Sequence, residues 1–594
     1  AENILNGFNS EKIDPTDYPS IAGTGSLSFL AEGKLELGRM KFSRINTSPS
    51  RDLITLFKGN NISLGMDLGD GSVGVNSVVF DYPDNSDKDH RVVVSSKSDV
   101  HFLSGVNLTT PALSLSARNF DINNSKITVG GTFGSRIDVQ DTLSLRAGST
   151  IESLSPSGKS DSTVLDPVSI DISSQQLLLE PDSYILATNH GDDIKGNRPI
   201  ADLNIQAGEI SLEDAIISTQ STNAAKAGDL DVAAAGIVLD KDSRIGSYSF
   251  SRGESGGITI GSSRFTMSEG SAVESGLNQS ILNRENDPYA SGNSGDIQIA
   301  SEILNLEGGS YIRNAQIDTA LPGDVSITSD EIKISRRSFI STESVPLYQI
   351  EFSNRTEVDQ NGSVSIKTKS LDLSESSYVK TTTVIPKRNA GDIIIEADAV
   401  SLSGRSSMLS NTEPNKFETE LGLTELDYGN AGRLEIKTDS LQLADQSKIS
   451  SDSFTSGDGG DVTLTATDLA LANRSAIYAG ALSQGEGGRI TIDTAAMNLS
   501  GKSAVVADVR DSGNGGEVSV KAAALDMDES LIYGSTSGEG VGSRISVDTD
   551  SITLKHGARI ESAASAGGAA GELVVQSGIV TITGTGEGFD PKDI

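Results

Sequence analysis

The fold is decided by a short pattern that recurs in Ser456-Gly-Asp-Gly-Gly-Asp-Val-Thr-Leu464, Gly485-Glu-Gly-Gly-Arg-Ile-Thr-Ile492 and Gly513-Asn-Gly-Gly-Glu-Val-Ser-Val520. In each stretch a glycine is followed by one variable residue and then by two apolar residues that lie two positions apart. Apolar residues at every second position are typical of a strand with one buried face. The repetition therefore indicates an array of short strands.

The pattern keeps an even spacing from residue 228 to the C-terminal region. If the last glycine of the pattern is the anchor, eight of eleven intervals are 27 to 29 residues and three are 39 to 41. Apolar residues fall 2, 4, 9, 11 and 17 positions after most anchors, and a noisier form of the frame extends upstream to about residue 104. The anchors are Gly228, Gly256, Gly295, Gly323, Gly362, Gly391, Gly432, Gly460, Gly488, Gly516, Ser543 and Gly571.

This spacing predicts a solenoid. A unit of about 28 residues cannot bury a core alone, but stacked units share a continuous one. We predict an all-β fold, a single right-handed parallel β-helix with about 28 residues and three short strands per coil. A β-propeller needs longer blades and usually a Trp signature, and this chain has no Trp. The anchor glycine is expected at a corner that requires positive φ or close packing.

The predicted organisation is an N-terminal arm or cap over residues 1–20, a rod over 21–582 and a tail over 583–594. Strands before about residue 100 are expected but cannot be phased. A stacked sheet exposes an edge at each end. The chain is therefore expected to be one segment of a longer protein, or a subunit whose ends meet other copies in a filament.

Three insertions break the spacing, at 274–290, 341–361 and 410–430. They fall on every second coil, so they are expected to emerge from one edge of the rod. Two interpretations are open: the loops pack on each other and cover the flank, or they form a lateral binding patch for glycan, matrix or a protein partner. The candidate binding residues are aromatic: Tyr289, Tyr348, Phe352, Phe417 and Tyr428.

Composition excludes several classes of protein. The 594 residues contain 47 Lys and Arg against 82 Asp and Glu, a formal net charge of −35. This charge argues against binding nucleic acid or an anionic membrane through a broad surface. The absence of Cys excludes disulfides, thiolate zinc sites and thiol nucleophiles. No apolar run approaches the length of a membrane span, so membrane insertion is not expected.

Catalytic chemistry has little support in the sequence. The four His are scattered, which argues against a catalytic triad or a zinc site. An acidic residue often follows the anchor, and it is expected either as a solvated turn residue or as part of a calcium-binding edge. The acidic run that contains Asp452, Asp458 and Asp461 is the candidate calcium site. We expect no other cofactor, and a carbohydrate-active β-helix enzyme remains the least favoured alternative.

The glycine-rich units at 456–464, 485–492 and 513–520, followed by Leu469-Ala-Leu471 and Ser475-Ala-Ile477, resemble the repeats of filamentous haemagglutinin-type exoproteins. These are large adhesins secreted by two-partner secretion in Gram-negative bacteria and cyanobacteria, and Val580-Thr-Ile-Thr-Gly-Thr585 resembles another recurring element of theirs. The resemblance covers residues 135–582. The Asn-Pro-type motif of the family's secretion domain is not found.

The resemblance implies a right-handed β-helix, secretion through an outer-membrane partner and an adhesive or matrix role. We therefore predict a non-enzymatic extracellular rod, part of a bacterial surface adhesin or biofilm-matrix exoprotein. Its expected partners are a host or bacterial surface glycan or matrix, or further copies of itself. The alternative is a structural filament subunit that polymerises end to end.

Overall fold

The computed structural model describes residues 20–23, 27–31, 34–37, 40–44, 53–59, 61–64, 78–81, 90–130, 134–154, 168–189, 200–221, 225–250, 253–277, 292–317, 320–345, 359–414, 428–565 and 567–584. All regular secondary structure in these ranges is β-strand. The chain forms two compact units: unit 1 contains residues 1–266 and 271–295, and unit 2 contains residues 267–270 and 296–594. Each unit consists of two parallel sheets, which we call sheet A and sheet B.

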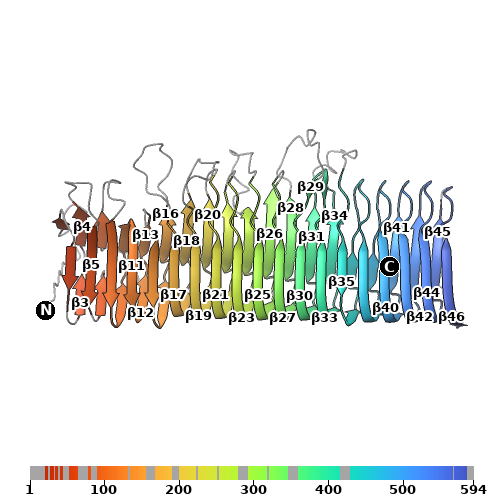
Figure 1. The fold of residues 1–594 in the computed structure, drawn as a ribbon, viewed down its shortest axis with the longest axis horizontal. Helices are drawn as coiled ribbons and strands as arrows, with labels where there is room; N and C mark the ends of the chain where they lie inside the picture. Colours follow the sequence, from red (N-terminus) through yellow and green to blue (C-terminus); the bar gives the residue numbers. More distant parts are fainter. Residues whose placement is uncertain are drawn as a thin grey trace. The chain divides into compact units, whose positions relative to one another are not determined.

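In unit 1 the strands of both sheets follow one another in chain order (Figure 1). Sheet B contains β2 (Leu27–Leu30), β3 (Lys34–Leu37), β5 (Leu53–Gly59), β6 (Asn61–Leu64), β8 (His90–Ser96), β9 (Asp99–Phe102), β11 (Ala112–Ala117), β12 (Asn119–Asn123), β14 (Ser135–Val139), β15 (Thr142–Arg146), β17 (Ile170–Leu179), β19 (Leu203–Glu213), β21 (Leu230–Asp240) and β23 (Ile258–Met267). Sheet A contains β1 (Ser20–Gly23), β4 (Met40–Arg44), β7 (Val78–Asp81), β10 (Val106–Thr110), β13 (Lys126–Val129), β16 (Thr150–Leu154), β18 (Tyr184–Asn189), β20 (Ile216–Ser221), β22 (Arg244–Ser249) and β24 (Ala272–Leu277).

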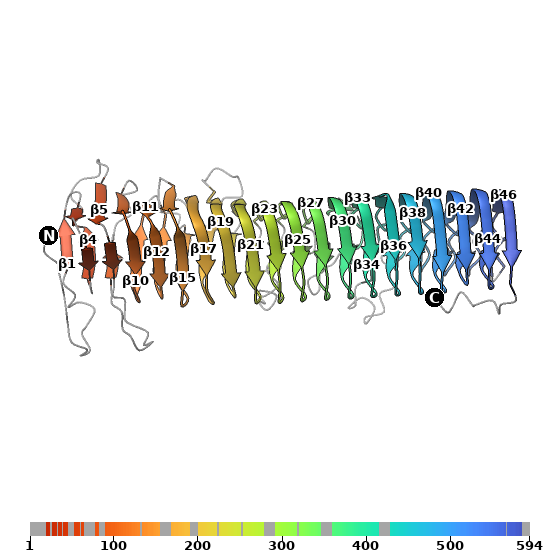
Figure 2. The same cartoon turned by 90° about the horizontal axis from the view of Figure 1, so that it is seen from below.

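Unit 2 repeats the arrangement, and Figure 2 shows its strands stacked side by side. Sheet B contains β25 (Ile297–Leu306), β27 (Val325–Ile334), β30 (Val364–Leu373), β33 (Ile393–Leu402), β35 (Leu434–Lys437), β36 (Ser440–Leu443), β38 (Val462–Leu471), β40 (Arg489–Ser500), β42 (Glu517–Asp528), β44 (Arg544–Lys555) and β46 (Leu573–Thr583). Sheet A contains β26 (Tyr311–Ile317), β28 (Phe339–Val345), β31 (Tyr378–Thr383), β34 (Ser407–Thr412), β37 (Lys448–Ser450), β39 (Ala476–Tyr478), β41 (Ala504–Val509), β43 (Leu531–Thr536) and β45 (Arg559–Ala564). The short strands β29 (Asp359–Gln360) and β32 (Arg388–Asn389) pair with each other.

Each repeat pairs with the next in parallel, so equivalent residues stack in columns. Val462 lies opposite Ile490, which lies opposite Val518, and all three are buried. We call the strands of one repeat a rung. The predicted apolar positions form the cores of both units, and the aliphatic columns explain how the protein folds with few aromatic residues. An all-β fold with long parallel sheets is thus confirmed.

The number of strands per rung differs between the N-terminal rungs and the later ones. Up to β16 each rung contributes two short strands to sheet B and one to sheet A, as predicted. From β17 onward the two sheet B strands are continuous, apart from β35 and β36, so the prediction of three strands per rung is wrong there. The continuous strands must bend, because Leu464 and Leu469 are both buried although five positions separate them.

A side-chain hydroxyl six positions after the anchor holds this bend in several rungs. The Thr494 hydroxyl donates to Ala496 O of its own rung and to Thr467 O of the preceding rung, both at 3.0 Å. Ser329 makes the same pair of contacts, at 3.0 Å to Glu331 O and 3.2 Å to Glu302 O. The strand therefore continues through the bend instead of ending in a turn.

A turn of two residues with positive φ connects sheet B to sheet A in many rungs. Asn473 and Arg474 have φ of 55° and 64°, and Gly501 and Lys502 have φ of 60° and 64°. Left-handed backbone is unfavourable for most side chains, so the register of the stack must impose it at Arg474 and Lys502. These turns place a row of polar side chains along one margin of sheet A.

Close packing, rather than positive φ, explains the anchor glycines. A Cβ on Gly488 would lie 2.0 Å from Gly460 O, and one on Gly460 would lie 2.0 Å from Gly432 O. No anchor glycine has positive φ. Of the two explanations considered from sequence, close backbone approach is therefore the right one.

Several described residues of the three predicted insertions belong to strands. Residues 274–277 belong to β24, residues 341–345 to β28, residues 359–360 to β29 and residues 410–412 to β34. Residues 278–290, 346–358 and 415–427 of the three insertions lie outside the described residues, as do residues 1–19 of the predicted arm and residues 585–594 of the predicted tail.

Candidate functional site

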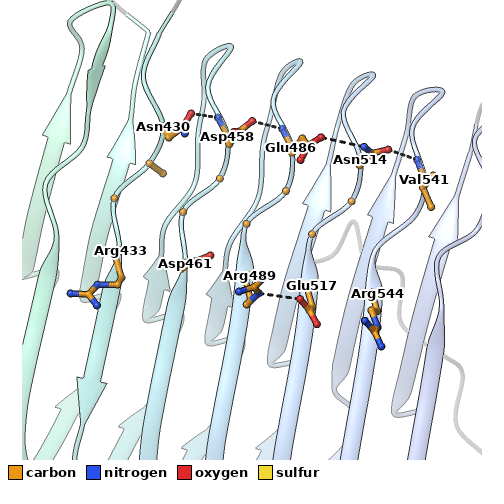
Figure 3. A pocket seen from close by; sticks show the side chains of 18 of the residues that line it. Asn430, Arg433, Asp458, Asp461, Glu486, Arg489, Asn514, Glu517, Val541 and Arg544 are labelled. Atoms are coloured by element: carbon orange, nitrogen blue, oxygen red, sulfur yellow. Dashed lines mark hydrogen bonds and ion pairs between the residues drawn. The ribbon is translucent and has the colours of Figure 1, made fainter. Parts of the chain in front are cut away.

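Two surface features of unit 2 contain the polar residues singled out from the sequence. The first, which we call the glycine trough, follows the corner where each rung enters sheet B (Figure 3). Its bottom is formed by glycines, including Gly460, Gly488 and Gly516. Its two sides are rows of side chains, one at Asn430, Asp458, Glu486, Asn514 and Val541, and the other at Arg433, Asp461, Arg489, Glu517 and Arg544.

The first row is a chain of backbone caps. The backbone N–H of Asp458 donates to Asn430 Oδ1 at 2.9 Å, and the N–H of Glu486 donates to Asp458 Oδ1 at 2.8 Å. The N–H of Val541 donates to Asn514 Oδ1 at 3.0 Å. The side chains of Asn430, Asp458 and Asn514 thus each satisfy an amide of the next rung that no strand ladder uses. Glu486 instead accepts a hydrogen bond from the Asn514 side-chain amide at 3.3 Å.

The second row alternates in charge. Arg489 Nε donates to Glu517 at 3.0 Å, and Arg544 Nε lies 3.3 Å from Glu572. Earlier rungs of unit 2 have an aspartate cap at this position, since the N–H of Asp324 donates to Asp296 Oδ1 at 2.9 Å. Several acidic residues of this row therefore act as backbone caps or ion-pair partners, whereas Asp461 is exposed and has neither contact among the described residues.

The structure does not bring together the three carboxylates of the candidate calcium site. Asp458 and Asp461 lie on opposite sides of the glycine trough, while Asp452 lies two residues beyond the end of β37 in sheet A. Within the described ranges, no group of three or more His, Cys, Asp and Glu side chains is arranged to hold a metal ion. Calcium binding stays a prediction. For Asp458, the hydrogen bond that its carboxylate accepts from the Glu486 N–H explains the acidic residue without a metal ion.

The second feature, which we call the sheet A hollow, is a depression of about 850 Å³ over β37, β39, β41 and β43. It exists because outward positions there carry small side chains: Ala476 and Ala504 are buried beneath it, with Val506 and Leu531 beside them. Tyr478 and Tyr533 pack on this cluster and remain partly exposed. Phe454, 38% exposed, is a third aromatic residue that lines the hollow.

Asp452 and Asp508 approach each other across Gly480. Both carboxylates have an oxygen close to the place where a Cβ on Gly480 would lie, at 3.3 Å for Asp452 and 3.1 Å for Asp508. Asp452 is buried and accepts hydrogen bonds from the Ser450 hydroxyl and the Gly480 N–H, both at 2.7 Å. Only a residue without a side chain can occupy the middle rung.

Burial makes these carboxylates reluctant to ionise. It raises the pKa of Asp452 to about 6, against the two hydrogen bonds, which lower it. Burial also raises the pKa of Asp508, while Arg510 opposes the change. The pKa of Tyr478 rises to about 12, because the hydroxyl is buried and faces both carboxylates.

The rim of the sheet A hollow is basic. Its lining includes four basic residues and two acidic ones, whereas the lining of the glycine trough has three basic and four acidic residues. Arg405 and Arg474 occupy positive-φ turns, and Lys448 begins β37. The ion pairs found among the described residues include none for these three cations. Arg510 lies 3.9 Å from Asp508.

A second column of aromatic residues on sheet A is built differently. Tyr311, Phe339 and Tyr378 occupy successive rungs, and their rings stack with centroids 4.9 Å and 4.7 Å apart and planes within 5°. Burial raises the pKa of Tyr378 to about 12. These three rings pack on one another and form a structural column. Tyr478 and Tyr533 do not occupy adjacent rungs, because Val506 lies between them in the register.

Of the five aromatic residues predicted for binding, Tyr428 lies in the described part of the chain. Tyr289, Tyr348, Phe352 and Phe417 lie outside the described residues. Tyr428 is half-buried, and it forms an isolated antiparallel bridge with Pro386.

Sequence reasoning missed the sheet A hollow. The available signal was that Tyr478 and Tyr533 lie one position after the buried Ile477 and Ile532, and so must point outward. Because aromatic residues are scarce in this chain, two tyrosines that point outward were themselves a signal for a surface site.

No helix in the described part of the chain has the length and hydropathy of a membrane span. Comparison with known proteins does not assign the chain: no protein-family model, curated protein or solved structure matches it.

Proposed function

We propose that this protein is a non-enzymatic, extracellular β-helical rod that binds glycan, as part of a bacterial surface adhesin or biofilm-matrix exoprotein. A single right-handed parallel β-helix is the architecture we propose for it. The parallel register between successive rungs and the two-sheet cross-section support this architecture. Secretion through an outer-membrane partner is proposed on the resemblance of its repeats to filamentous haemagglutinin-type exoproteins.

The sheet A hollow is the observation that carries the binding proposal. Aromatic side chains that are fixed by packing on a rigid sheet offer apolar faces to sugar rings without a large ordering cost. Tyr478 and Tyr533 are held in this way by Ala476, Ala504 and Leu531. Charged and polar groups around them supply the few directional contacts that a binding site needs.

The test is retention of the purified protein on bacterial or host surface glycans in an array. Tyr478→Ala and Tyr533→Ala are expected to lower retention, and the double variant to abolish it. Tyr184→Ala, which removes a half-buried tyrosine from sheet A of unit 1, is the matched control. Circular dichroism and melting must show that the variants fold. Unchanged retention by the folded double variant would overturn the proposal.

Stacking on a further copy is a second candidate function, which a specific observation favours. The last strand of sheet B, β46, presents Ile579, Val580 and Ile582 at 63%, 57% and 73% exposure. Their equivalents in the preceding strand, β44, lie beneath them in parallel register. A strand of the same pattern from a second copy would cover this row and extend the sheet, as unpaired strand edges do.

Sedimentation tests this alternative without reference to glycan. Val580→Lys with Ile582→Lys should keep the protein monomeric if copies stack at β46, because charged side chains block the addition of a strand. If the unaltered protein is monomeric at high concentration, stacking of copies is excluded as its function.

A further inference from the structure

We infer that the sheet A hollow binds three consecutive sugars of an extended polysaccharide whose pyranose rings are joined through equatorial positions, with the chain lying along the stacking direction. This inference rests on the proposed glycan-binding function and narrows its substrate class. Three features of unit 2 support it: the length of an apolar strip in the hollow, the polar groups beside that strip, and the contrast with the other aromatic column of sheet A.

The apolar strip crosses three successive rungs. Tyr478 pairs in register with Val506, and Val506 pairs with Tyr533, so the three residues occupy equivalent positions. Polar residues hold this position on the rungs at either end, because Ser450 pairs with Tyr478 and Glu561 pairs with Tyr533. Adjacent strands are about 4.8 Å apart, so the backbones of the two tyrosines lie about 9.6 Å apart. The strip therefore has a defined length.

This length suits three sugars of an extended chain. Each pyranose ring in such a chain advances by a distance similar to one strand spacing. The first and third sugars would then lie over Tyr478 and Tyr533, and the middle sugar would lie over Val506. Val506 is 6% exposed and forms a low apolar step between two partly exposed rings. An apolar surface thus faces each of the three sugars.

Hydrogen-bonding groups lie along one side of the strip. Asp508 and Ser535 pair in register two positions further along their strands, and both line the hollow. The Asp508 side chain is 21% exposed, and its carboxylate can accept hydrogen bonds from hydroxyl groups. On the other side of the strip, Ala476 and Ala504 are buried. A ligand that fits must therefore combine an apolar face with hydroxyl groups at its edge.

Equatorial linkage combines these properties in one chain. A pyranose ring with equatorial substituents has C–H groups on its two faces and hydroxyl groups around its edge. Equatorial linkages also keep successive rings in a flat, extended ribbon, so three rings can contact a straight strip without a large ordering cost. An axial linkage turns the chain at every sugar, and a coiled chain would leave the strip after one or two contacts.

The other aromatic column of sheet A does not offer such a surface. Tyr311, Phe339 and Tyr378 occupy three adjacent rungs, and their parallel rings stack with centroids 4.9 Å and 4.7 Å apart. Most of the ring faces in this column are therefore covered by a neighbouring ring. Tyr478 and Tyr533 are two rungs apart, too far to stack on each other, because Val506 lies between them.

The experiment measures the affinities of cellobiose, cellotriose and cellohexaose by calorimetry, with maltotriose as a trisaccharide whose linkages are axial at C1. Cellotriose is expected to bind about tenfold more tightly than cellobiose, because a chain of three sugars is needed to reach both tyrosines. Cellohexaose should gain less than about tenfold over cellotriose, since its further sugars lie beyond the strip, and maltotriose should bind about tenfold more weakly than cellotriose or worse.

Tyr533→Ala tests the length of the strip directly. The substitution shortens the strip to two rungs, so it should abolish the gain in affinity from cellobiose to cellotriose. Tyr378→Ala, which removes a ring of the other aromatic column from the same sheet, is the matched control and should leave that gain unchanged. Circular dichroism must show that both variants fold.

Three results would overturn the inference. Cellotriose may bind no more tightly than cellobiose or not at all, maltotriose may bind as tightly as cellotriose, or the affinity may rise by a further factor of about ten or more from cellotriose to cellohexaose. The proposed function is judged separately, by retention on the glycan array. It survives these results if the double variant of Tyr478 and Tyr533 still loses retention, and it fails if the folded double variant is retained unchanged.

Discussion

The glycine trough and the sheet A hollow are both made by repetition, yet they treat their polar groups in opposite ways. In the trough, side chains cap the amides of the next rung or pair with the opposite charge, as Asp458 does with the Glu486 amide and Arg489 with Glu517. In the hollow, no such partner is found for Arg405 or Arg474 in the part of the chain that the structure describes, and Asp452 is buried. The comparison teaches that a repeat which satisfies its own polar groups maintains the stack. Where unpaired cations surround fixed aromatic rings, as in the hollow, a ligand site is the better interpretation.

The largest expected effect is on the bottom of the glycine trough. In Gly488→Ala the new Cβ would lie 2.0 Å from Gly460 O, so the backbone must move and stability should fall by about 3 kcal/mol or more. Gly261→Ala is the matched control, because a Cβ there has no atom within 4 Å. Thermal melting measures both. Equal melting temperatures for the two variants would show that the glycine columns are not required by packing.

The second effect concerns the buried carboxylate of the hollow. Because burial raises the pKa of Asp452 to about 6, the folded state binds its proton more tightly than the unfolded state does. The stability from this group is fully present below the unfolded pKa, near 4, and is lost as the pH rises through about 6. The loss amounts to about 2 to 3 kcal/mol at neutral pH.

Asp452→Asn removes that charge and should therefore stabilise the protein at pH 7.5 while changing little at pH 4. Asp458→Asn is the control, because it neutralises a half-buried carboxylate of the trough while the amide oxygen can still accept the hydrogen bond from the Glu486 N–H. Melting temperatures at the two pH values provide the measurement. If Asp452→Asn has the same effect at both pH values, Asp452 does not titrate in this window.

A smaller effect separates two carboxylates of the trough. Asp458→Ala removes the cap on the Glu486 amide and should cost about 1 kcal/mol. Asp461→Ala removes an exposed carboxylate from the other side and should stay within about 0.5 kcal/mol. Urea melts of the two variants test the difference. Melts in calcium chloride and in chelator test the calcium prediction: a calcium-dependent rise in stability that both variants lose would establish it, and no rise would refute it.

The smallest expected effect is on the alternating charges. Arg489→Gln breaks the exposed ion pair with Glu517 and should cost less than about 0.5 kcal/mol, an effect that high salt removes. Lys521→Gln, an exposed cation in the same sheet with no ion pair among the described residues, is the control. A cost above about 1 kcal/mol that persists in high salt would mean that the row is a cooperative network and not a set of weak pairs.

The sequence by itself determined the repeat, its phase from residue 104 and the residues that form the core. Those features depend on the local alternation of apolar and polar residues and on a constant repeat length, and both can be read directly from the amino-acid sequence. For the anchor glycines, the sequence offered two explanations, close packing and positive φ, and it could not decide between them.

Only the tertiary structure decided what lies beside what across rungs. Arg405, Asp452, Tyr478 and Tyr533 are far apart in sequence, and they line one hollow because parallel pairing stacks residues about one repeat apart. The same pairing separated Asp452 from Asp458, although the two are near neighbours in the chain. A column of equivalent positions is a property of the register, and register is fixed by packing and hydrogen bonds between rungs rather than by the sequence of one rung.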